Sequence, residues 1–403
     1  MPKKSAGPAA VLSVADAEAL RRIIAVKPRW DGVVRIGDVA GQDRPCLFHA
    51  GPAFASTDEI PAPVRNSLAF GCLYEGWAKS WDEADAMIVA GDVAIMPAQG
   101  SGLLVPLAGV ASPSMAAVRI SDQGSAGVRH CVLNEGADIA TRLGRRDERL
   151  LEHHRWLNGD LADWLSGCLA EPLSIYPLLL ESFAQGDDGH AQTGAGSQLV
   201  AAALRRRAFD TPQAVGEFLK GSAAFALNIW MATIALASGA AEGVAGSTLV
   251  TRAGGNGVSF GYMLAGEAGR WRVADAPRLA GTVEARFGAS VPTGALGDSA
   301  VLDLFGLGGM NLAGAPTLAA ALAEHLPKDA LVRSEIILAG RHPGFGSRMV
   351  ACSAERVISA GVGPIILLGM IDAEGKAGRL GGGVVDAPPE LFAVGPDVGA
   401  AAE

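Results

Sequence analysis

Two polar segments carry side chains that could transfer a proton. The segment GDDGH at 186–190 combines carboxylates with His190, a combination suited to general acid–base catalysis or to holding a metal ion. A polar loop between helices would have the same composition. Glu135 stands in LNEG at 133–136, at the end of an expected strand, where α/β folds often place binding groups. A turn held by an Asx hydrogen bond is an equal alternative there.

A third carboxylate, Asp298, lies in a segment that resembles an earlier part of the chain. The stretches GDVAIMPAQGSG, from Gly91, and GDSAVLDLFGLGG, from Gly297, share glycine, aspartate and alanine in one register. Two related α/β halves could therefore meet at a glycine-lined cleft. Chance similarity is the equal alternative in a chain with 53 glycines.

The segment GRHPGFGSR at 340–348 is the strongest candidate for binding an anion. It places Arg341, His342 and Arg348 around a glycine-rich turn. The arginine fork suits phosphate or carboxylate, and glycines allow backbone N–H groups to approach a ligand closely. A solvated loop is the competing interpretation.

The segment TRAGGNGVSFG raises the question of whether Gly254 to Gly257 form a turn or a binding loop. Asn256-Gly257 between two expected strands predicts a two-residue hairpin turn. Such a turn does not require Gly254 and Gly255, and additional glycines are useful where a ligand or another chain approaches closely. We expect a turn that also lines a cleft, with Arg252 and Asn256 nearby.

The pattern of apolar residues predicts an α/β (α+β) fold, with two mixed α/β domains flanking an all-helical one. In the N-terminal domain, 1–140, helices with serine N-caps are expected at 13–26 and 80–90, together with short strands. The segment 141–245 has helical periodicity throughout. In the C-terminal domain, 246–403, we expect a three-stranded meander, two helices and two further strands. Those helices and strands are predicted at 315–326, 353–360, 363–372 and 381–388.

Composition limits the class of protein. Hydrophobic residues make up 49% of the 403 residues and the net charge is -9, so a large core is expected and nucleic acid is an unsuitable partner. The five cysteines form no CxxC pair, which fits a reducing cytosol and predicts no structural metal. The apolar run 222–241 contains Asn228 and Thr233 and is expected to be a buried helix rather than a membrane span.

Several segments together resemble one known family. The stretches LAFGCLYEGWA, HCVLNEG, FAQGDDGH, TRAGGNGVSFG, GRHPGFGSR and GRLGGGVVDAPPELF are similar to those of the YlbE-like family of bacterial cytosolic proteins. One branch of that family is implicated as a subunit of oxamate carbamoyltransferase in allantoin breakdown. The resemblance implies transfer of a carbamoyl group between oxalurate and phosphate, with phosphate as co-substrate and no other cofactor. It also implies an acyl-CoA-synthetase-like partner and a third subunit, and we expect a homo-oligomer.

The resemblance also implies roles for the candidate residues. Arg341 and Arg348 would clamp a carboxylate or phosphate. Backbone N–H groups of Gly254, Gly255, Asn256 and Gly257, and of Gly308 and Gly309, would stabilise an oxyanion, while Asp298, Glu135 or His190 would move the proton. This sequence departs from the family pattern at Ser259, where glutamate is common, and at Ala191 and Gln192, where asparagine and arginine are usual. Two alternatives stay open: a non-catalytic assembly or ligand-binding subunit, and an amidohydrolase.

Overall fold

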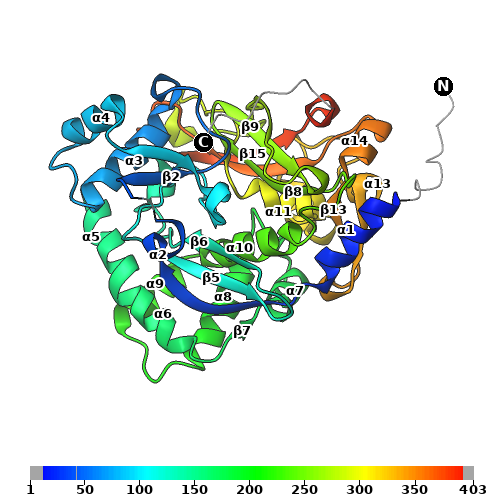
Figure 1. Cartoon of the computed structure of the whole chain (residues 1–403), viewed down its shortest axis with the longest axis horizontal. Coiled ribbons are helices and arrows are strands. Elements are labelled where there is room, and N and C mark those ends of the chain that lie inside the picture. Colours follow the sequence, from blue (N-terminus) through cyan, green and yellow to red (C-terminus); the bar gives the residue numbers. More distant parts are fainter. Residues whose placement is uncertain (1–11, 42, 394–403) are drawn as a thin grey trace.

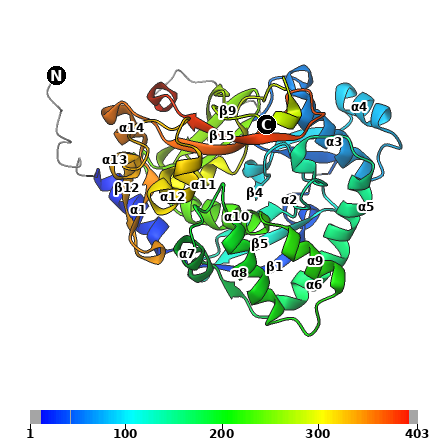
Figure 2. The same cartoon turned by 180° about the vertical axis from the view of Figure 1, so that it is seen from behind.

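The computed structural model describes residues 12–41 and 43–393, and Figures 1 and 2 show it from opposite sides. Helix α10 (Phe225–Gly239) lies in the middle of the molecule, between the sheet formed by early strands and elements from the last third of the chain. Helix α1 (Val14–Ala25) packs against α10 and strand β12 (Leu338–His342), two elements that lie far from it in the sequence. The mixture of helices with several sheets confirms the α+β class.

The first sheet has five strands in the order β4–β6–β5–β1–β7. Its central strands β1 and β5 are antiparallel, with a bulge between Trp30 and Gly32. The strand bounds are β1 Pro28–Arg35, β4 Leu103–Leu104, β5 Ala116–Asp122, β6 Val128–Val132 and β7 Leu173–Ser174. Strand β7 lies within the segment expected to be entirely helical.

The second sheet has the order β10–β9–β8–β11, so the expected meander is present. Three two-stranded sheets complete the strands: β2 with β3, β12 with β13, and β14 with β15. The bounds are β2 Cys46–His49, β3 Ala94–Pro97, β8 Val250–Asn256, β9 Ser259–Leu264, β10 Arg272–Asp275, β11 Leu296–Gly297, β13 Arg348–Cys352, β14 Ile365–Ile371 and β15 Arg379–Asp386.

Helix starts follow the local sequence closely where a cap is present. Ser13 accepts a hydrogen bond from the Asp16 N–H at the start of α1, and Ser80 does the same for Glu83 at the start of α4. The other helices are α2 Ile36–Ala40, α3 Ala62–Tyr74, α4 Trp81–Ala90, α5 Arg149–Trp156, α6 Ala162–Cys168, α7 Tyr176–Ala184, α8 Gly194–Arg205, α9 Gln213–Gly221, α11 Ala300–Phe305, α12 Pro316–Ala321, α13 Arg333–Ile337 and α14 Ala354–Ala360.

Two expectations about local structure are wrong. Helix α12 ends at Ala321 instead of continuing to residue 326. The following residues approach Pro327, and the residue before a proline is disfavoured in helical conformation. The two similar glycine-containing segments also fold differently, because residues 94–97 form a strand whereas 300–305 form a helix.

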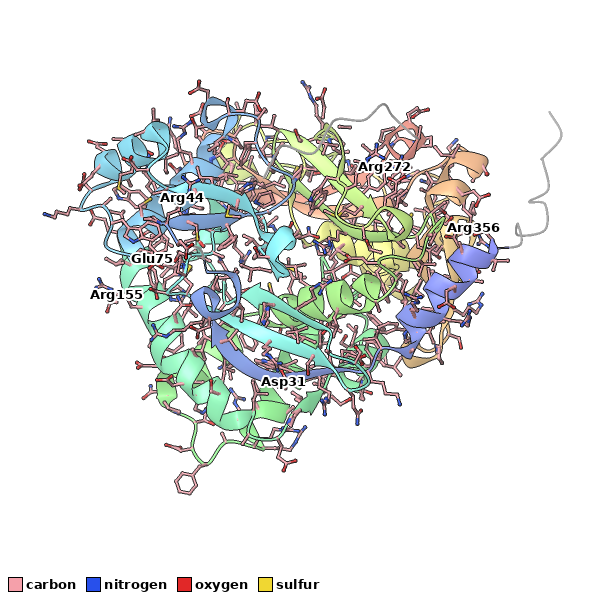
Figure 3. All side chains as sticks on the ribbon, viewed as in Figure 1. Asp31, Arg44, Glu75, Arg155, Arg272 and Arg356 are labelled. Atoms are coloured by element: carbon pink, nitrogen blue, oxygen red, sulfur yellow. The ribbon has the colours of Figure 1, made fainter. Side chains whose placement is uncertain are left out.

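Helix α10 is the centre of the largest hydrophobic cluster. Trp230 is fully buried there, and the cluster also includes Trp30 from β1 and Phe345 from the C-terminal part of the chain. Charged side chains such as Arg44 and Arg155 lie at the periphery (Figure 3). The cluster thus draws on all three expected domains, whose boundaries stay a prediction.

Across residues 12–41 and 43–393, no single helix is long and apolar enough to cross a membrane. In this described part of the chain, α9 and α10 taken together reach the required length and composition, and these two helices are bent by 72° relative to each other.

Candidate functional site

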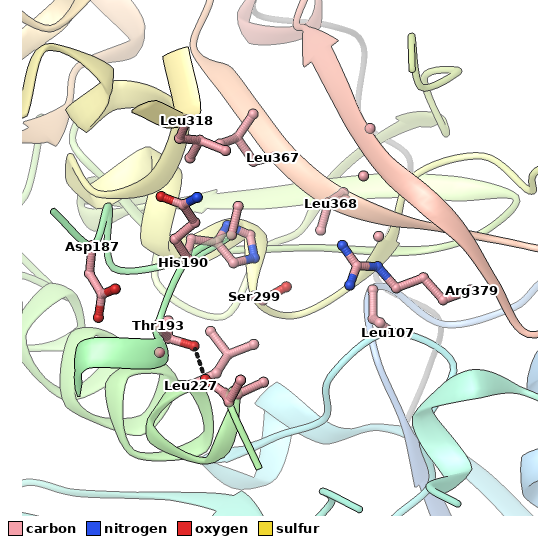
Figure 4. Close-up of a pocket in the computed structure, with 18 of the residues that line it drawn as sticks. Leu107, Asp187, His190, Thr193, Leu227, Ser299, Leu318, Leu367, Leu368 and Arg379 are labelled. Atoms are coloured by element: carbon pink, nitrogen blue, oxygen red, sulfur yellow. Dashed lines mark hydrogen bonds between the residues drawn. The ribbon is translucent and has the colours of Figure 1, made fainter. Parts of the chain in front are cut away.

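A cavity of about 600 Å³ lies where the start of α8, the start of α10, the start of α11 and the β14–β15 hairpin meet (Figure 4). A cavity of this volume is in the range typical of small-ligand sites. Its polar lining includes His190, Ser299 and Arg379, and Arg142 contributes from the turn at Thr141–Leu143. These residues are far apart in sequence, so the site depends on the complete fold.

His190 is a buried titratable group in the lining of the cavity. Its Nδ1 lies 2.7 Å from Asp303 Oδ2 on α11, and its ring reaches the cavity lining. Burial disfavours the imidazolium, but the adjacent Asp303 carboxylate outweighs this effect and raises the pKa of His190 above its usual value. An Nδ1–H donated to Asp303 leaves the Nε2 lone pair free for the cavity, which is the arrangement a general base needs.

Asp303 is itself held firmly. Its second oxygen, Oδ1, accepts hydrogen bonds from the N–H of Gly309 at 2.8 Å and from the N–H of Leu367 at 3.1 Å. These bonds come from the turn at Gly308–Gly314 and from β14. The carboxylate is therefore oriented toward His190 by two separate elements.

The loop that carries His190 is organised by its own aspartates. Asp188 is fully buried and accepts hydrogen bonds from the N–H groups of His190, Ala191 and Gln192. Asp187 accepts from the N–H of Ala195 at 3.3 Å and of Gly196 at 2.7 Å, so it caps the start of α8. Ala191 and Gln192, two of the positions that depart from the family pattern, line the cavity.

Arg142 is oriented by Glu135. Its Nη2 donates to Glu135 Oε1 at 2.8 Å, and Glu135 Oε1 also accepts from the N–H groups of Gly136 and Ala137. The Nε of Arg142 is buried without a hydrogen-bond partner. Glu135 thus lies behind the cavity as a positioning residue, while Arg142 lines it.

Arg379, at the start of β15, is the second arginine that lines the cavity. Its Nε donates to the carbonyl of Gly381 at 3.2 Å, and in the described part of the chain no carboxylate forms an ion pair with it. Removal of surrounding water lowers the pKa of Arg379 and the charge of Arg142 lowers it further, while the carboxylates of Glu284 and Glu135 oppose this shift without reversing it. Two arginines in the lining of one cavity create a positive potential there that favours a bound anion.

The remaining wall is apolar. Leu318 and Leu322 come from α12 and the turn after it, and Leu367 and Leu368 come from β14. Leu107, also in the lining, has a positive φ of 45°, a conformation that is rare for a bulky residue. An apolar wall lowers the local dielectric and strengthens each interaction between a bound anion and the arginines.

Asp298 does not face the cavity. Its Oδ1 accepts from the Gly51 N–H and from Gln99 Nε2, and its Oδ2 accepts from the Val105 N–H. Full burial raises the pKa of Asp298 to about 7, although these hydrogen bonds oppose the shift. The structure therefore places Asp298 as a cross-link between the N-terminal and C-terminal parts of the chain.

The expected hairpin turn is shifted by one residue. Gly255 pairs with Phe260, so Gly257 and Val258 are the central residues of the turn, and only Gly257 has a positive φ. Asn256 instead accepts from the N–H groups of Val258 and Ser259 through its side chain. Asn256 therefore holds the turn as an Asx cap.

The two additional glycines serve packing. A Cβ at Gly255 would lie 2.1 Å from the carbonyl oxygen of Ala295, and one at Gly254 would lie 2.6 Å from Asp298 Oδ1. Residues 254–257, expected to line a cleft, are not part of the lining of this cavity; other side chains and backbone segments of the chain pack against their glycines.

Gly308 and Gly309 also have their N–H groups occupied. The Gly308 N–H donates to the carbonyl of Asp188, and the Gly309 N–H donates to Asp303. Both glycines hold the loop and the carboxylate behind His190, so neither N–H is free for an oxyanion.

The expected anion-binding segment at 340–348 forms a hairpin away from the cavity. Arg341 is exposed and paired with Glu335 at 2.8 Å. Arg348 lies over the ring of Phe183 at 4.6 Å and donates to Asn311. Burial lowers the pKa of His342 to about 4, so this side chain is neutral.

Arg252 is also outside the main cavity. It forms an ion pair with Glu242 and donates to the carbonyl of Gln99. The three arginines expected to bind an anion thus make contacts within the protein. Two other arginines, Arg142 and Arg379, line the cavity.

Sequence reasoning missed Arg142, Asp303, Ser299 and Arg379. Arg142 stands among several charged residues in RLGRRDER, and Arg379 follows a turn in AEGKAGRL. Neither segment has a local signal that distinguishes a ligand-binding arginine from a surface one.

Fold and cavity together define a class, an α+β protein with a cavity suited to a small anion. The family model described as "Oxamate carbamoyltransferase subunit AllG" matches residues 93–299, just over half of the chain. The chain therefore belongs to this family. This match confirms the expected resemblance to an oxamate carbamoyltransferase subunit. It does not test the name YlbE-like for the family.

Individual relatives agree with this assignment. The chain is 27% identical to "Oxamate carbamoyltransferase subunit AllG" of Escherichia coli (strain K12), over 94% of this chain and 95% of that one. It is 26% identical to "Uncharacterized protein YahG" of the same organism, over 94% and 84%. A crystal structure of a conserved protein of unknown function from Enterococcus faecalis V583 superposes with a TM-score of 0.87 at 25% identity, covering 94% of this chain and 95% of that one.

Proposed function

We propose that this chain is the substrate-binding subunit of a carbamoyltransferase that acts on a small ureido acid, with oxalurate as the first candidate. The observation that carries the proposal is the His190–Asp303 pair, which opens into a cavity opposite the unpaired Arg379. Family membership supports the same reaction class. Allantoin nitrogen catabolism would then be the source of the substrate.

The chemistry assigns a role to each group. Arg379 and Arg142 bind the carboxylate of the ureido acid. His190 Nε2 accepts the proton of hydrogen phosphate as a phosphate oxygen attacks the carbamoyl carbon. The bond between that carbon and the oxamate nitrogen breaks, and the nitrogen receives the proton from His190. The products are oxamate and carbamoyl phosphate, so atoms and charge balance.

A complex with other subunits is part of the proposal. Leu331, Val332 and Ile336 lie exposed at or beside α13, and Ile358 is exposed on the neighbouring helix α14. Several exposed apolar residues on two contacting helices are a feature that favours a protein partner. We propose an acyl-CoA-synthetase-like subunit and a third subunit as partners. The buried free thiols of the five cysteines support a cytoplasmic setting.

The same exposed patch also favours a second candidate, a non-catalytic subunit whose cavity holds a ligand for a partner. A third candidate, hydrolysis of an amide by water in place of phosphate, is distinguished by its independence of phosphate.

The test is an assay of the purified chain with oxalurate and phosphate, following carbamoyl phosphate, with and without the partner subunits. Wild type should be compared with Arg379→Gln and with Arg341→Gln, which removes an exposed arginine outside the cavity. Loss of product with the first variant alone supports the proposal. Equal activity of both variants and wild type would refute the role of the cavity.

A further inference from the structure

The hydroxyl of Ser299 is a polar group of the cavity that the proposed proton transfer does not use. Ser299 is only 2% exposed and lines the cavity, and its side chain makes no capping hydrogen bond at the start of α11. Within residues 12–41 and 43–393, its Oγ has no hydrogen-bond partner. A buried hydroxyl normally has a partner, so an atom bound in the cavity is expected to supply the missing hydrogen bond.

Helix α11 places Ser299 beside the pair formed by His190 and Asp303. Ser299 has helical backbone angles, φ -64° and ψ -16°, and precedes Asp303 by four residues. Side chains four residues apart lie on the same face of a helix, one turn from each other. Asp303 holds the His190 ring at 2.7 Å, and both His190 and Ser299 reach the lining of the same cavity. The unpaired hydroxyl therefore lies at the end of the cavity where His190 would transfer a proton.

On its other side, Ser299 approaches Leu107 and, beyond it, Arg379. A Cβ added at Gly297 would lie 2.8 Å from the backbone nitrogen of Leu107 and 3.5 Å from Ser299 Oγ. A Cβ added at Gly369 would lie 3.3 Å from both Leu107 Cδ1 and Arg379 Nε. In Figure 4 the Ser299 hydroxyl lies between the imidazole and the Arg379 guanidinium, all three in the lining of one cavity. A ligand that joins these two groups would pass Ser299.

The reaction of the proposed function needs a hydrogen-bond donor at this place. When phosphate attacks the carbamoyl carbon, negative charge develops on the carbonyl oxygen of the group that is transferred. The N–H groups of Gly308 and Gly309 donate within the protein, and Arg142 and Arg379 would hold the substrate carboxylate. The hydroxyl of Ser299 is still able to donate.

We propose that Ser299 is a further catalytic residue, whose hydroxyl donates a hydrogen bond to the carbonyl oxygen of the carbamoyl group. The bond becomes stronger as that oxygen gains negative charge, so it stabilises the transition state more than the bound substrate. Ser299 keeps its proton throughout, while His190 carries the proton from phosphate to the leaving nitrogen. This assignment rests on the proposed function, because the group that Ser299 contacts belongs to the substrate of that reaction.

The test compares two ligands that differ by the carbamoyl group alone, oxalurate and oxamate. Both Kd values are measured by calorimetry on the purified full chain in the absence of phosphate, so that no transfer takes place. Ser299→Ala should weaken oxalurate binding about 3- to 10-fold, the contribution of one neutral hydrogen bond, and leave oxamate binding unchanged. Arg379→Gln should weaken both ligands about tenfold or more, because they share the carboxylate. Loss of a hydroxyl without a protein partner leaves no protein group unsatisfied, so Ser299→Ala should fold, and unchanged oxamate binding verifies this.

The matched control is Ser238→Ala, which removes a serine of equal burial from the last turn of α10, outside the cavity lining. It should leave both affinities unchanged. In the assembled complex, Ser299→Ala should lower kcat about 10²- to 10³-fold, the usual effect of removing one donor to an oxyanion. Equal weakening of oxalurate and oxamate in Ser299→Ala, unchanged oxalurate binding, or a carbamoyl group found on Ser299 by mass spectrometry would overturn the proposal.

The binding comparison also separates this inference from the proposed function. Selective loss of oxalurate binding in Ser299→Ala, in a chain that forms no carbamoyl phosphate with its partners, would contradict only the proposed function. An active wild type whose oxalurate affinity and kcat do not depend on Ser299 would contradict only this inference. A wild-type chain that binds neither ligand would contradict both.

Discussion

Replacing Asp303 with asparagine tests the proposed proton transfer most directly. In the wild type, Asp303 Oδ2 lies 2.7 Å from His190 Nδ1 and Oδ1 accepts two backbone N–H groups. Asparagine can keep its oxygen on the two N–H groups and must then turn its amide nitrogen toward His190. That amide donates to Nδ1, so the imidazole proton moves to Nε2 and the lone pair that faced the cavity is lost.

The expected loss of kcat is about 10²- to 10⁴-fold, the usual contribution of a positioned general base. The free energy of unfolding should fall by about 1.5–3 kcal/mol, the contribution of one hydrogen bond to a charged group. Because Asp303 raises the pKa of His190, its stabilising effect is complete below the unfolded pKa of histidine, about 6.5, and is lost as pH rises through the folded pKa. The stability difference between wild type and Asp303→Asn should therefore be largest at low pH.

Three measurements check this reasoning on the same protein. Nitrogen NMR of the imidazole reports which ring nitrogen carries the proton. A pH–rate profile of the complex should show the acid limb of Asp303→Asn at lower pH than that of the wild type, since the carboxylate that contributes most to raising the pKa of His190 is removed. Chemical denaturation at several pH values gives the stability difference.

A wild-type kcat in an Asp303→Asn protein whose His190 tautomer has inverted would refute a base role for His190. A fall in kcat without any change of tautomer or pH profile would instead indicate that Asp303 only supports the fold.

Three further perturbations follow from the same contacts. Arg379→Gln should raise the KM for the carboxylate substrate about 10- to 100-fold with a smaller effect on kcat, because a charge-assisted hydrogen bond to the substrate is lost. An unchanged KM in steady-state kinetics would contradict this. Gly255→Ala should reduce the free energy of unfolding by about 3 kcal/mol, because its Cβ would meet the Ala295 backbone at 2.1 Å. The control is Gly167→Ala in α6, where a Cβ meets open space. This control variant should be more stable than wild type by about 0.5–1 kcal/mol. In wild type, the pKa of Asp298, raised to about 7 by burial, should make the free energy of unfolding fall as pH rises from about 4 to about 7. Asp298→Asn should remove that part of the pH dependence, and denaturation at pH 5 and pH 8 measures it.

Sequence reasoning succeeded where structure depends on neighbouring residues. The Ser13 and Ser80 caps and the meander beginning at β8 were all predictable, because cap and turn chemistry acts within a few residues. His190 was selected as a candidate because its polar loop is unusual locally, and the structure places it in the cavity.

The remaining site residues could not be predicted, because their role arises only from tertiary contacts. Arg341 and Arg379 have similar local surroundings of glycine and charge. Only the fold pairs the first with Glu335 and places the second in a cavity, where no described carboxylate forms an ion pair with it. Likewise, Gly255 is required by the Ala295 backbone and Gly254 by the Asp298 and Gln99 side chains. All of these groups are distant in sequence, so local sequence patterns do not reveal them.

The dispersed origin of the cavity walls has a consequence during synthesis. A ribosome releases His190 and Asp303 long before Arg379, and the Leu367 N–H that helps to orient Asp303 belongs to the late strand β14. A chain interrupted before β15 would contain a proton-transfer pair with an incompletely held carboxylate and no Arg379 opposite it. Interrupted translation products would therefore be unable to bind the anion. Under the proposed function they would be inert, and would not consume substrate in an uncoupled reaction.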